Sequence, residues 1–301
     1  MPRVKNLLAE LPPAEVIDIE AIRAGLADGG IELVCVLGPT ASGKTRYAVQ
    51  LARELGGEII SADSRQVYRG MDIGTGKDLA EYGEIPYHLI DVADPGDGYN
   101  VFRFAEDFGK AYADIRSRGA VPILCGGTGL YINAVTSGYD FRSHKPLSAP
   151  KDSGGEGLSF PKTMAARGHV NGGDPLAEGM ERSGSLQEGE CRIAVPRTYF
   201  IGTLVTREVR NARIDARLDA RLQEGMIDEI RGLLDRGVEP SVLLSYGLEY
   251  KYVTLYLLGE LDYAAMREKL AIAIHQFAKR QMTWFRGMER SGTVIHWTEP
   301  N

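Results

Sequence analysis

The chain has 301 residues, of which 44% are hydrophobic and 25% are charged, an ordinary composition for a globular protein with a sizeable core. No apolar run reaches the roughly 18 residues of a membrane-spanning helix, and the N-terminus lacks a signal-peptide pattern. We therefore expect a cytoplasmic protein without membrane spans. The net charge of −6 argues against non-specific nucleic-acid binding but does not exclude a nucleic-acid substrate.

Strand and helix patterns alternate over the first half of the chain. Residues 1–30 are expected to form an N-terminal extension with a helix near 14–27. Helical periodicity covers 100–119 and 128–138, and Gly119 suits the end of the first of these helices. Apolar runs predict strands at residues 31–37, 58–63, 87–94 and 120–127. This order predicts an α/β fold with a parallel sheet flanked by helices.

The motif GPTASGKT follows the first predicted strand and precedes a helix-like stretch. In that context it is a phosphate loop, because backbone N–H groups and the helix dipole converge on a phosphate. Lys44 would reach the outer phosphate oxygens, and the Thr45 hydroxyl would ligate Mg²⁺. The predicted phosphate-binding residues are Gly38, Pro39, Thr40, Ala41, Ser42, Gly43, Lys44 and Thr45. The loop alone leaves the reaction open, since kinases, nucleoside triphosphatases and diphosphate-using transferases share it.

Other polar residues stand at or just past predicted strand ends, where ligands bind in such sheets. Asp63 would ligate a metal, accept a proton from a nucleophile, or cap a turn. Thr128 would either cap the next helix or hold a substrate. Asp91 also follows a predicted strand, and the turn at Gly74–Lys77 is a candidate second phosphate contact. Cys35 and Cys125 lie in apolar runs, and with Cys191 they show no metal-ligand spacing.

The second half begins with a segment of different character, because residues 151–190 contain nine glycines and show no sustained period. We predict an irregular insertion over 142–196. A strand is expected at 198–205, a helical stretch hinged near Gly225 at 212–237, helices at 246–258 and 263–288, and a strand at 293–297. Two basic stretches, taken alone, read as solvated helix faces: Arg197, Arg207, Arg210, Arg213 and Arg217, then Lys279, Arg280, Arg286 and Arg290.

Several long motifs in order resemble those of tRNA dimethylallyltransferases. They are GPTASGKT, ADSRQVYRGMDIGTGK, CGGTGLYINAV, ARIDARLDARLQEGMIDEI, GLEYKYVTLYLLGEL and HQFAKRQMTWFRGMERSG. The resemblance covers about residues 31–141 and 198–297. It implies a phosphate-loop core over 31–141, completed by residues 197–301. It also implies Mg²⁺-dependent transfer of a dimethylallyl group from dimethylallyl diphosphate to the exocyclic amine of adenosine 37, beside the tRNA anticodon.

The resemblance also implies roles for individual residues. Asp63 matches the general base, Thr128 its partner across the channel, and Thr45 the magnesium contact. Arg213 and Arg217, one helical turn apart, match the position of an arginine that faces the departing diphosphate, and Lys44 would stabilise its developing charge. The residues expected to contact the tRNA anticodon arm are Asp63, Ser64, Arg65, Gln66, Lys279, Arg280 and Arg286. We expect the enzyme to be a monomer.

Residues 142–196 depart from the family, whose members carry a mostly helical insertion that grips the anticodon arm. Two interpretations stay open: a stretch translated in a shifted reading frame that is restored near Val195, or a divergent insert. Three other functions are therefore kept: prenyl transfer to a free adenine nucleotide, a phosphate-loop kinase of a small metabolite, and an inactive relic. The nucleotide transferase would need no tRNA-gripping insertion, and the kinase would not need the block at Lys279–Arg286.

Overall fold

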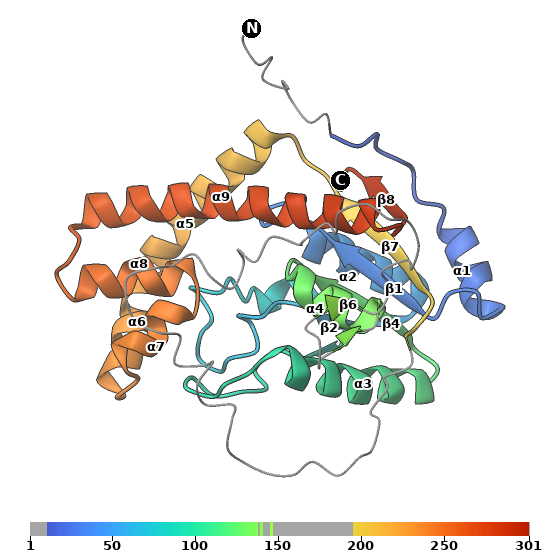
Figure 1. The fold of residues 1–301 in the computed structure, drawn as a ribbon, viewed down its shortest axis with the longest axis horizontal. Coiled ribbons are helices and arrows are strands. Elements are labelled where there is room, and N and C mark those ends of the chain that lie inside the picture. The colour runs from blue at the N-terminus through green and yellow to red at the C-terminus, as the bar shows by residue number, and fades with distance from the viewer. Residues whose placement is uncertain (1–10, 138, 141–144, 147–194, 301) are drawn as a thin grey trace, which may run out of the picture. The chain divides into compact units, whose positions relative to one another are not determined.

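The computed structural model describes residues 11–137, 139–140, 145–146 and 195–300 (Figure 1). The irregular insertion predicted at 142–196 falls almost wholly outside these residues. The strands of the central sheet all run parallel, in the order β3-β2-β4-β1-β7-β8. They are β1 Leu33–Leu37, β2 Gly57–Ser61, β3 Tyr87–His88, β4 Val121–Gly126, β7 Thr198–Thr203 and β8 Ile295–Thr298. The predicted α/β class is confirmed.

Helices cover the sheet and continue into the C-terminal half (Figure 1). The first group is α1 Ile19–Ala27, α2 Lys44–Leu55, η1 Leu79–Tyr82, α3 Val101–Ser117 and α4 Gly129–Thr136. The second group is α5 Arg207–Glu224, α6 Met226–Asp235, α7 Pro240–Ser245, α8 Leu248–Leu257 and α9 Tyr263–Arg290. Gly225, with φ +106°, separates α5 from α6, which confirms the predicted hinge. The short α7 was not predicted. Two strands of two residues each, β5 Tyr139–Asp140 and β6 Lys145–Pro146, pair antiparallel and complete the described elements.

The predicted strand at 87–94 was too long, because only β3 pairs with the sheet. Leu89 and Asp91 adopt positive φ angles of 61° and 56°, which end the extended conformation. The chain then bonds to the loop after β2, where Asp91 N donates to Gln66 O at 3.1 Å. Asp91 therefore lies beside that loop and not at a strand end.

The core occupies both faces of the sheet, since side chains alternate along each strand. Val34 and Val36 of β1 pack with α1 and α2, whereas Leu33, Cys35 and Leu37 pack on the other face with α3, α4 and the C-terminal helices. Burial raises the pKa of both buried cysteines, which are unpaired, and that of Cys125 to about 12. Their predicted role in core packing is confirmed; Cys191 lies outside the described residues.

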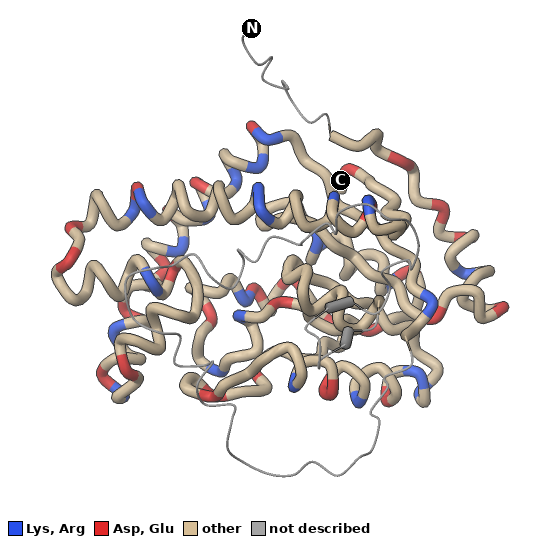
Figure 2. The backbone as a smooth tube through the Cα atoms, in the orientation of Figure 1, with Lys and Arg blue, Asp and Glu red and all other residues tan. Residues whose placement is uncertain are grey.

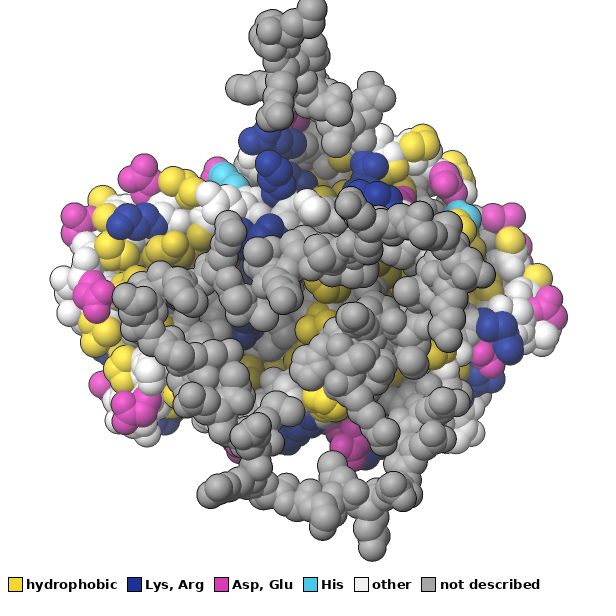
Figure 3. All heavy atoms as spheres, in the orientation of Figure 1, with side chains coloured by type: hydrophobic (Ala, Val, Ile, Leu, Met, Phe, Trp, Pro, Cys, Tyr) yellow, Lys and Arg dark blue, Asp and Glu magenta, His cyan; other side chains and the backbone are white. Residues whose placement is uncertain are grey.

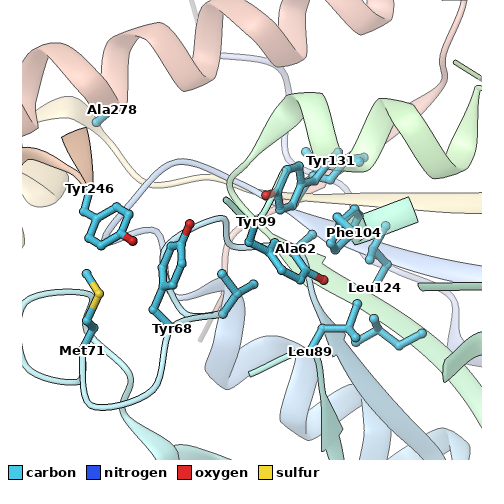
Figure 4. Packing of buried hydrophobic residues seen from close by; sticks show 14 of the residues in the cluster. Ala62, Tyr68, Met71, Leu89, Tyr99, Phe104, Leu124, Tyr131, Tyr246 and Ala278 are labelled. Carbon is cyan, nitrogen blue, oxygen red and sulfur yellow. The ribbon is translucent and has the colours of Figure 1, made fainter. Parts of the chain in front are cut away.

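Aromatic contacts pack the first half of the chain and also join it to the second (Figure 4). Phe104 of α3 stacks on Tyr131 of α4 with ring centroids 4.1 Å apart. Tyr68, in the loop after β2, lies 4.5 Å from Tyr246, which follows α7. The loop that carries the polar residues after β2 is thus packed against the C-terminal helices. Among the helices that the structure describes, none is long and apolar enough to cross a membrane.

Candidate active site

The phosphate loop joins β1 to α2, as the motif predicted. Ala41 and Gly43 have positive φ angles of 60° and 83°, and Gly43 caps α2 without any side-chain hydrogen bond. The first N–H groups of a helix have no intrahelical partner, so this end of α2 is available to an anion. Lys44 and Thr45 form the first turn and are half-buried.

Two loop residues have structural contacts of their own. The Ser42 hydroxyl is buried and lies 2.7 Å from the Thr203 hydroxyl of β7. A Cβ at Gly38 would clash with the same Thr203 hydroxyl, which explains why glycine is required there. These two positions fix the loop on the sheet, so any phosphate contact they make would come from the backbone.

Gln281 of α9 links the phosphate loop to the turn after β4. Its Oε1 accepts a hydrogen bond from Thr40 N at 2.8 Å, and its Nε2 donates to Gly127 O at 2.9 Å. Gln281 is only 6% exposed. The turn after β4 also carries Thr128, so one side chain holds the phosphate loop and Thr128 in a fixed relation. Gln281 stands inside a recognised sequence block, but nothing in the pattern indicated this contact.

Asp63 and Thr128 lie at the ends of the neighbouring strands β2 and β4. Asp63 Oδ1 accepts from Arg65 N at 2.9 Å, and Thr128 Oγ1 accepts from Ser64 N at 3.1 Å. Thr128 is the N-cap residue of α4 but its side chain forms no capping bond, so the capping interpretation is wrong. Within the described part of the chain, Asp63 Oδ2 has no hydrogen-bond donor. The structure thus brings both predicted residues together and leaves one carboxylate oxygen available.

Lys44 lies within electrostatic range of Asp63. Burial lowers the pKa of the Lys44 ammonium, and Asp63 partly offsets this effect by favouring the charged form. Arg217 of α5 also lowers that pKa, which places it within electrostatic range of the loop. A lysine, a carboxylate and an arginine therefore share one site at the carboxyl ends of β1, β2 and β4.

The two predicted arginines have different surroundings. Both are exposed, but Arg217 Nη2 donates to Gly76 O at 3.3 Å, whereas Arg213 has no hydrogen bond or ion pair among the described residues. A Cβ at Gly76 would clash with the guanidinium groups of both Arg217 and Arg221. Arg221, one turn further along α5, was missed by the sequence analysis, as was its neighbour Glu249. Position on a helix alone did not distinguish Arg213 from Arg217.

The turn at Gly74–Lys77 is not a second phosphate site. Glu229 of α6 binds the amides at the start of this turn and just before it, accepting from Asp72 N at 2.8 Å, Ile73 N at 2.7 Å and Gly74 N at 3.0 Å. The Lys77 ammonium is fully buried and donates to Tyr68 O and Asp72 Oδ1, each at 2.7 Å, and to Asp91. A protein carboxylate therefore fills the place that the sequence assigned to a phosphate, and Asp91 has a structural role.

The segments predicted to contact tRNA are at the surface or beside the site. Lys279 and Arg280 are exposed on α9, and Arg286 is half-buried, with its guanidinium 3.8 Å from the Glu289 carboxylate. Arg65 lies beside Gly247 at the start of α8, and Gln66 Nε2 donates to Gly76 O at 3.3 Å. Lys and Arg recur along α5 and α9 (Figure 2), and basic side chains gather along the upper edge of the face in Figure 3.

The donor groups fit a magnesium ion that a substrate brings with it. Among the described residues there is no group of three or more His, Cys, Asp or Glu that could hold a metal. Mg²⁺ often keeps several waters and takes one or two protein ligands together with substrate phosphates. The Thr45 hydroxyl, in the first turn of α2, suits that arrangement.

Comparison with known proteins gives consistent matches. The family model described as IPP transferase matches residues 66–159 and 170–288, and the model described as isopentenyl transferase matches 31–84. The chain is 47% identical over 288 residues to tRNA dimethylallyltransferase 1 of Parabacteroides distasonis, covering 89% of this chain and 92% of the relative. It is 49% identical over 282 residues to tRNA dimethylallyltransferase 1 of Porphyromonas gingivalis, covering 89% and 93%.

Solved structures share the fold. The tRNA isopentenylpyrophosphate transferase of Bacillus halodurans matches with a TM-score of 0.67 at 33% identity, over 89% of each chain. A eukaryotic dimethylallyltransferase acting on tRNA matches with a TM-score of 0.64 at 23% identity, over 89% of this chain and 74% of that one. The second likeness is evidence for the fold alone.

Proposed function

Because the chain belongs to the IPP transferase family and is a tRNA dimethylallyltransferase, we propose that its phosphate loop binds the diphosphate of dimethylallyl diphosphate and that its acceptor is adenosine 37 in the anticodon arm. The observation that carries this proposal is the shared site of Lys44, Asp63 and Thr128 at the ends of three neighbouring strands. A donor-binding loop and an acceptor-binding pair at one sheet edge suit a transfer between two substrates.

The leaving diphosphate is held by positive groups on one side of the site. When the bond between the allylic carbon and oxygen breaks, the diphosphate takes the electron pair. Lys44, the free amides of α2 and Arg217 then face the charge that develops on its oxygens. Burial lowers the pKa of Lys44, and a diphosphate beside it would favour its charged form. Mg²⁺ bound at Thr45 would neutralise part of the same charge.

Asp63 receives the proton on the acceptor side. The exocyclic nitrogen of adenosine forms a bond to the allylic carbon and becomes acidic, and the free Oδ2 of Asp63 takes its proton. The hydrogen bond from Arg65 N fixes the other carboxylate oxygen, Oδ1. Thr128, whose hydroxyl accepts a hydrogen bond from Ser64 N, orients the adenine base of the acceptor. The adenosine must leave its stack to enter, as in other enzymes that act on bases.

Binding of the anticodon arm is assigned to the basic side chains around the site. Arg65, Lys279, Arg280 and Arg286 supply positive charge in a chain of net charge −6. Local charge, and not the net value, decides the field that a tRNA meets. The divergent insertion predicted at 142–196, where the family carries its tRNA-gripping helices, lies almost wholly outside the described residues. A cytoplasmic location and a monomeric state stay predictions.

The test is a product assay with three acceptors. The protein is incubated with dimethylallyl diphosphate and Mg²⁺ in the presence of an unmodified anticodon stem-loop, AMP or a small-metabolite panel with ATP. We expect prenyladenosine only with the stem-loop. Asp63→Asn should lower the rate by about 10²- to 10⁴-fold with little change in donor affinity. The control Asp235→Asn changes an exposed carboxylate at the end of α6 and should leave the rate unchanged.

Each alternative function has its own outcome in this assay. Equal turnover of AMP and stem-loop would indicate a free-nucleotide transferase, and phosphate transfer from ATP would indicate a kinase. Donor binding without turnover of any acceptor would indicate a relic. A change in Mg²⁺ dependence for Asp63→Asn would mean that Asp63 is a metal ligand and not the base.

A further inference from the structure

A cavity beside the phosphate loop is lined by Arg217 and by a second, largely buried arginine, Arg221. Its lining includes Thr40 and Ala41 of the loop, Arg217 and Arg221 of α5, and Glu249 of α8. Arg217 and Arg221 stand one helical turn apart, and both guanidinium groups lie against Gly76. Two cations are therefore directed to one small space next to the loop that binds phosphate.

Arg221 lacks the partners that a buried arginine requires. Its side chain is only 13% exposed, and its described ion pair joins Nη1 to Glu249 Oε1 at 3.8 Å, too long for a hydrogen bond. It makes no hydrogen bond within the described residues, although a guanidinium has five N–H donors. Burial, followed by the neighbouring Arg217, lowers the pKa of Arg221 to about 10. The charged form is thus poorly compensated in the free protein.

Glu249 compensates this charge only in part. Its side chain is 21% exposed, and burial raises the pKa of its carboxyl, an effect that Arg221 and then Arg217 oppose. Within the lining of the cavity, one carboxylate stands against two guanidinium groups, although Glu224 and Asp63 also act on Arg221 from outside it, and the N–H donors of Arg221 are unused among the described residues. A diphosphate carries negative charge and several oxygens, so it could accept hydrogen bonds from both arginines, since guanidinium groups bind phosphate with paired hydrogen bonds.

We propose that Arg221 is a second diphosphate-binding arginine, which contacts the donor substrate and the pyrophosphate product beside Arg217, while Glu249 holds it in place when the diphosphate is absent. This inference rests on the proposed function, because it takes the phosphate loop as the diphosphate site. It adds to that function a residue that the motif pattern did not indicate. In the transfer step Arg221 gains hydrogen bonds as the leaving oxygens gain charge.

The competing interpretation is that Arg221 and Glu249 are only a buried ion pair. Replacing one member of such a pair leaves an uncompensated charge, but replacing both with apolar residues is often neutral or stabilising. The double variant Arg221→Met/Glu249→Leu therefore separates the two interpretations. A purely structural pair predicts normal pyrophosphate binding in the double variant, whereas a diphosphate ligand predicts a loss.

The measurement is titration calorimetry of the full chain with pyrophosphate and Mg²⁺, alongside thermal unfolding. We expect the double variant to fold and to bind pyrophosphate about 10- to 100-fold more weakly than the wild type, the cost of one or two charge-assisted hydrogen bonds. Stem-loop binding, followed by fluorescence anisotropy, should be unchanged. The control Arg231→Met removes an exposed arginine of α6 and should alter neither quantity.

Milder variants keep the test decisive if the double variant does not fold. Glu249→Gln retains the arginine and removes the competing carboxylate, so its pyrophosphate affinity should equal or exceed that of the wild type. Arg221→Lys retains the positive charge but lacks the paired N–H donors of a guanidinium, so it should bind pyrophosphate more weakly than the wild type. Wild-type affinity in the double variant or in Arg221→Lys, or a loss in Glu249→Gln alone, would overturn the inference. A wild-type protein that binds no pyrophosphate would instead overturn the proposed function.

Discussion

Replacing Gln281 with leucine should damage the active site without touching either substrate. Leucine has a similar length but can neither accept from Thr40 N nor donate to Gly127 O, so two backbone groups lose their partners. A buried backbone group without a partner costs about 1–3 kcal/mol. The Thr40 amide is only part-buried and water can reach it. We therefore expect a loss of unfolding free energy in the lower half of the combined cost for the two backbone groups, about 2–4 kcal/mol.

The activity of Gln281→Leu should fall more than its stability indicates. Gln281 sets the position of the phosphate loop relative to Thr128, and a misplacement of about 1 Å between reacting groups can lower a rate by about 10²-fold. Urea unfolding gives the free-energy loss, and turnover on the stem-loop gives the rate. We expect kcat to fall by more than 10-fold, with a smaller change in the KM of the stem-loop.

Two variants control for this experiment. Gln276→Leu changes an exposed glutamine on the same helix and should be neutral in both assays. Gln281→Glu keeps the acceptor for Thr40 N but loses the donor to Gly127 O, and it adds a negative charge near the diphosphate. It should therefore raise the KM of dimethylallyl diphosphate. If Gln281→Leu matched Gln276→Leu in unfolding and in kcat, the positioning role of Gln281 would be wrong.

Three further predictions concern separate parts of the molecule. Lys44→Ala should lower kcat by about 10²- to 10³-fold, because one donor to the developing charge is lost, and single-turnover kinetics would show it. Arg118 holds the pKa of Glu58 below its ordinary value of 4.5, so the stabilisation by Glu58 is present above that pH and is lost on acidification. In the Glu58→Gln variant, the unfolding free energy measured by urea denaturation should accordingly decrease less steeply as the pH falls below 4.5. Arg280→Ala should weaken stem-loop binding and reduce its logarithmic salt dependence by about one unit, measured by anisotropy at several salt concentrations.

The parts of the fold that could be predicted from the sequence are those set by local pattern. The phosphate loop needs a buried strand, positive φ angles and a helix start, and all of these lie within 15 consecutive residues, 31–45. The hinge at Gly225 was predicted for the same reason, since a glycine there ends one helix and begins another. The strand at 87–94 failed because its apolar composition does not reveal the positive φ angles of Leu89 and Asp91.

The contacts that could not be predicted join residues far apart in the chain. Gln281 reaches the phosphate loop across 241 positions, and Glu229 reaches the turn at 72–74 across 155 to 157. In the sequence, the turn at Gly74–Lys77 has the composition of an anion-binding turn, but the predicted phosphate contact is wrong: an anion is bound by the amides of residues 72–74. The anion is a side chain of α6, which only the folded chain brings there. Composition pointed to this stretch of the chain but identified only one of the three donors, Gly74 N, and not their partner.

These long-range contacts give the C-terminal half a direct part in the site. β7 pairs with β1 inside the sheet, and its Thr203 fixes the phosphate loop through Ser42. α5 supplies Arg217, α6 holds the loop after β2 through Glu229, and α9 supplies Gln281. The residues at the ends of β1, β2 and β4 thus depend on helices that come after residue 197 for their geometry. α9 links the phosphate loop to the turn that carries Thr128, whereas α6 holds the loop after β2. Variants at Gln281 should therefore affect both the donor side and the acceptor side of the site, and variants at Glu229 mainly the acceptor side.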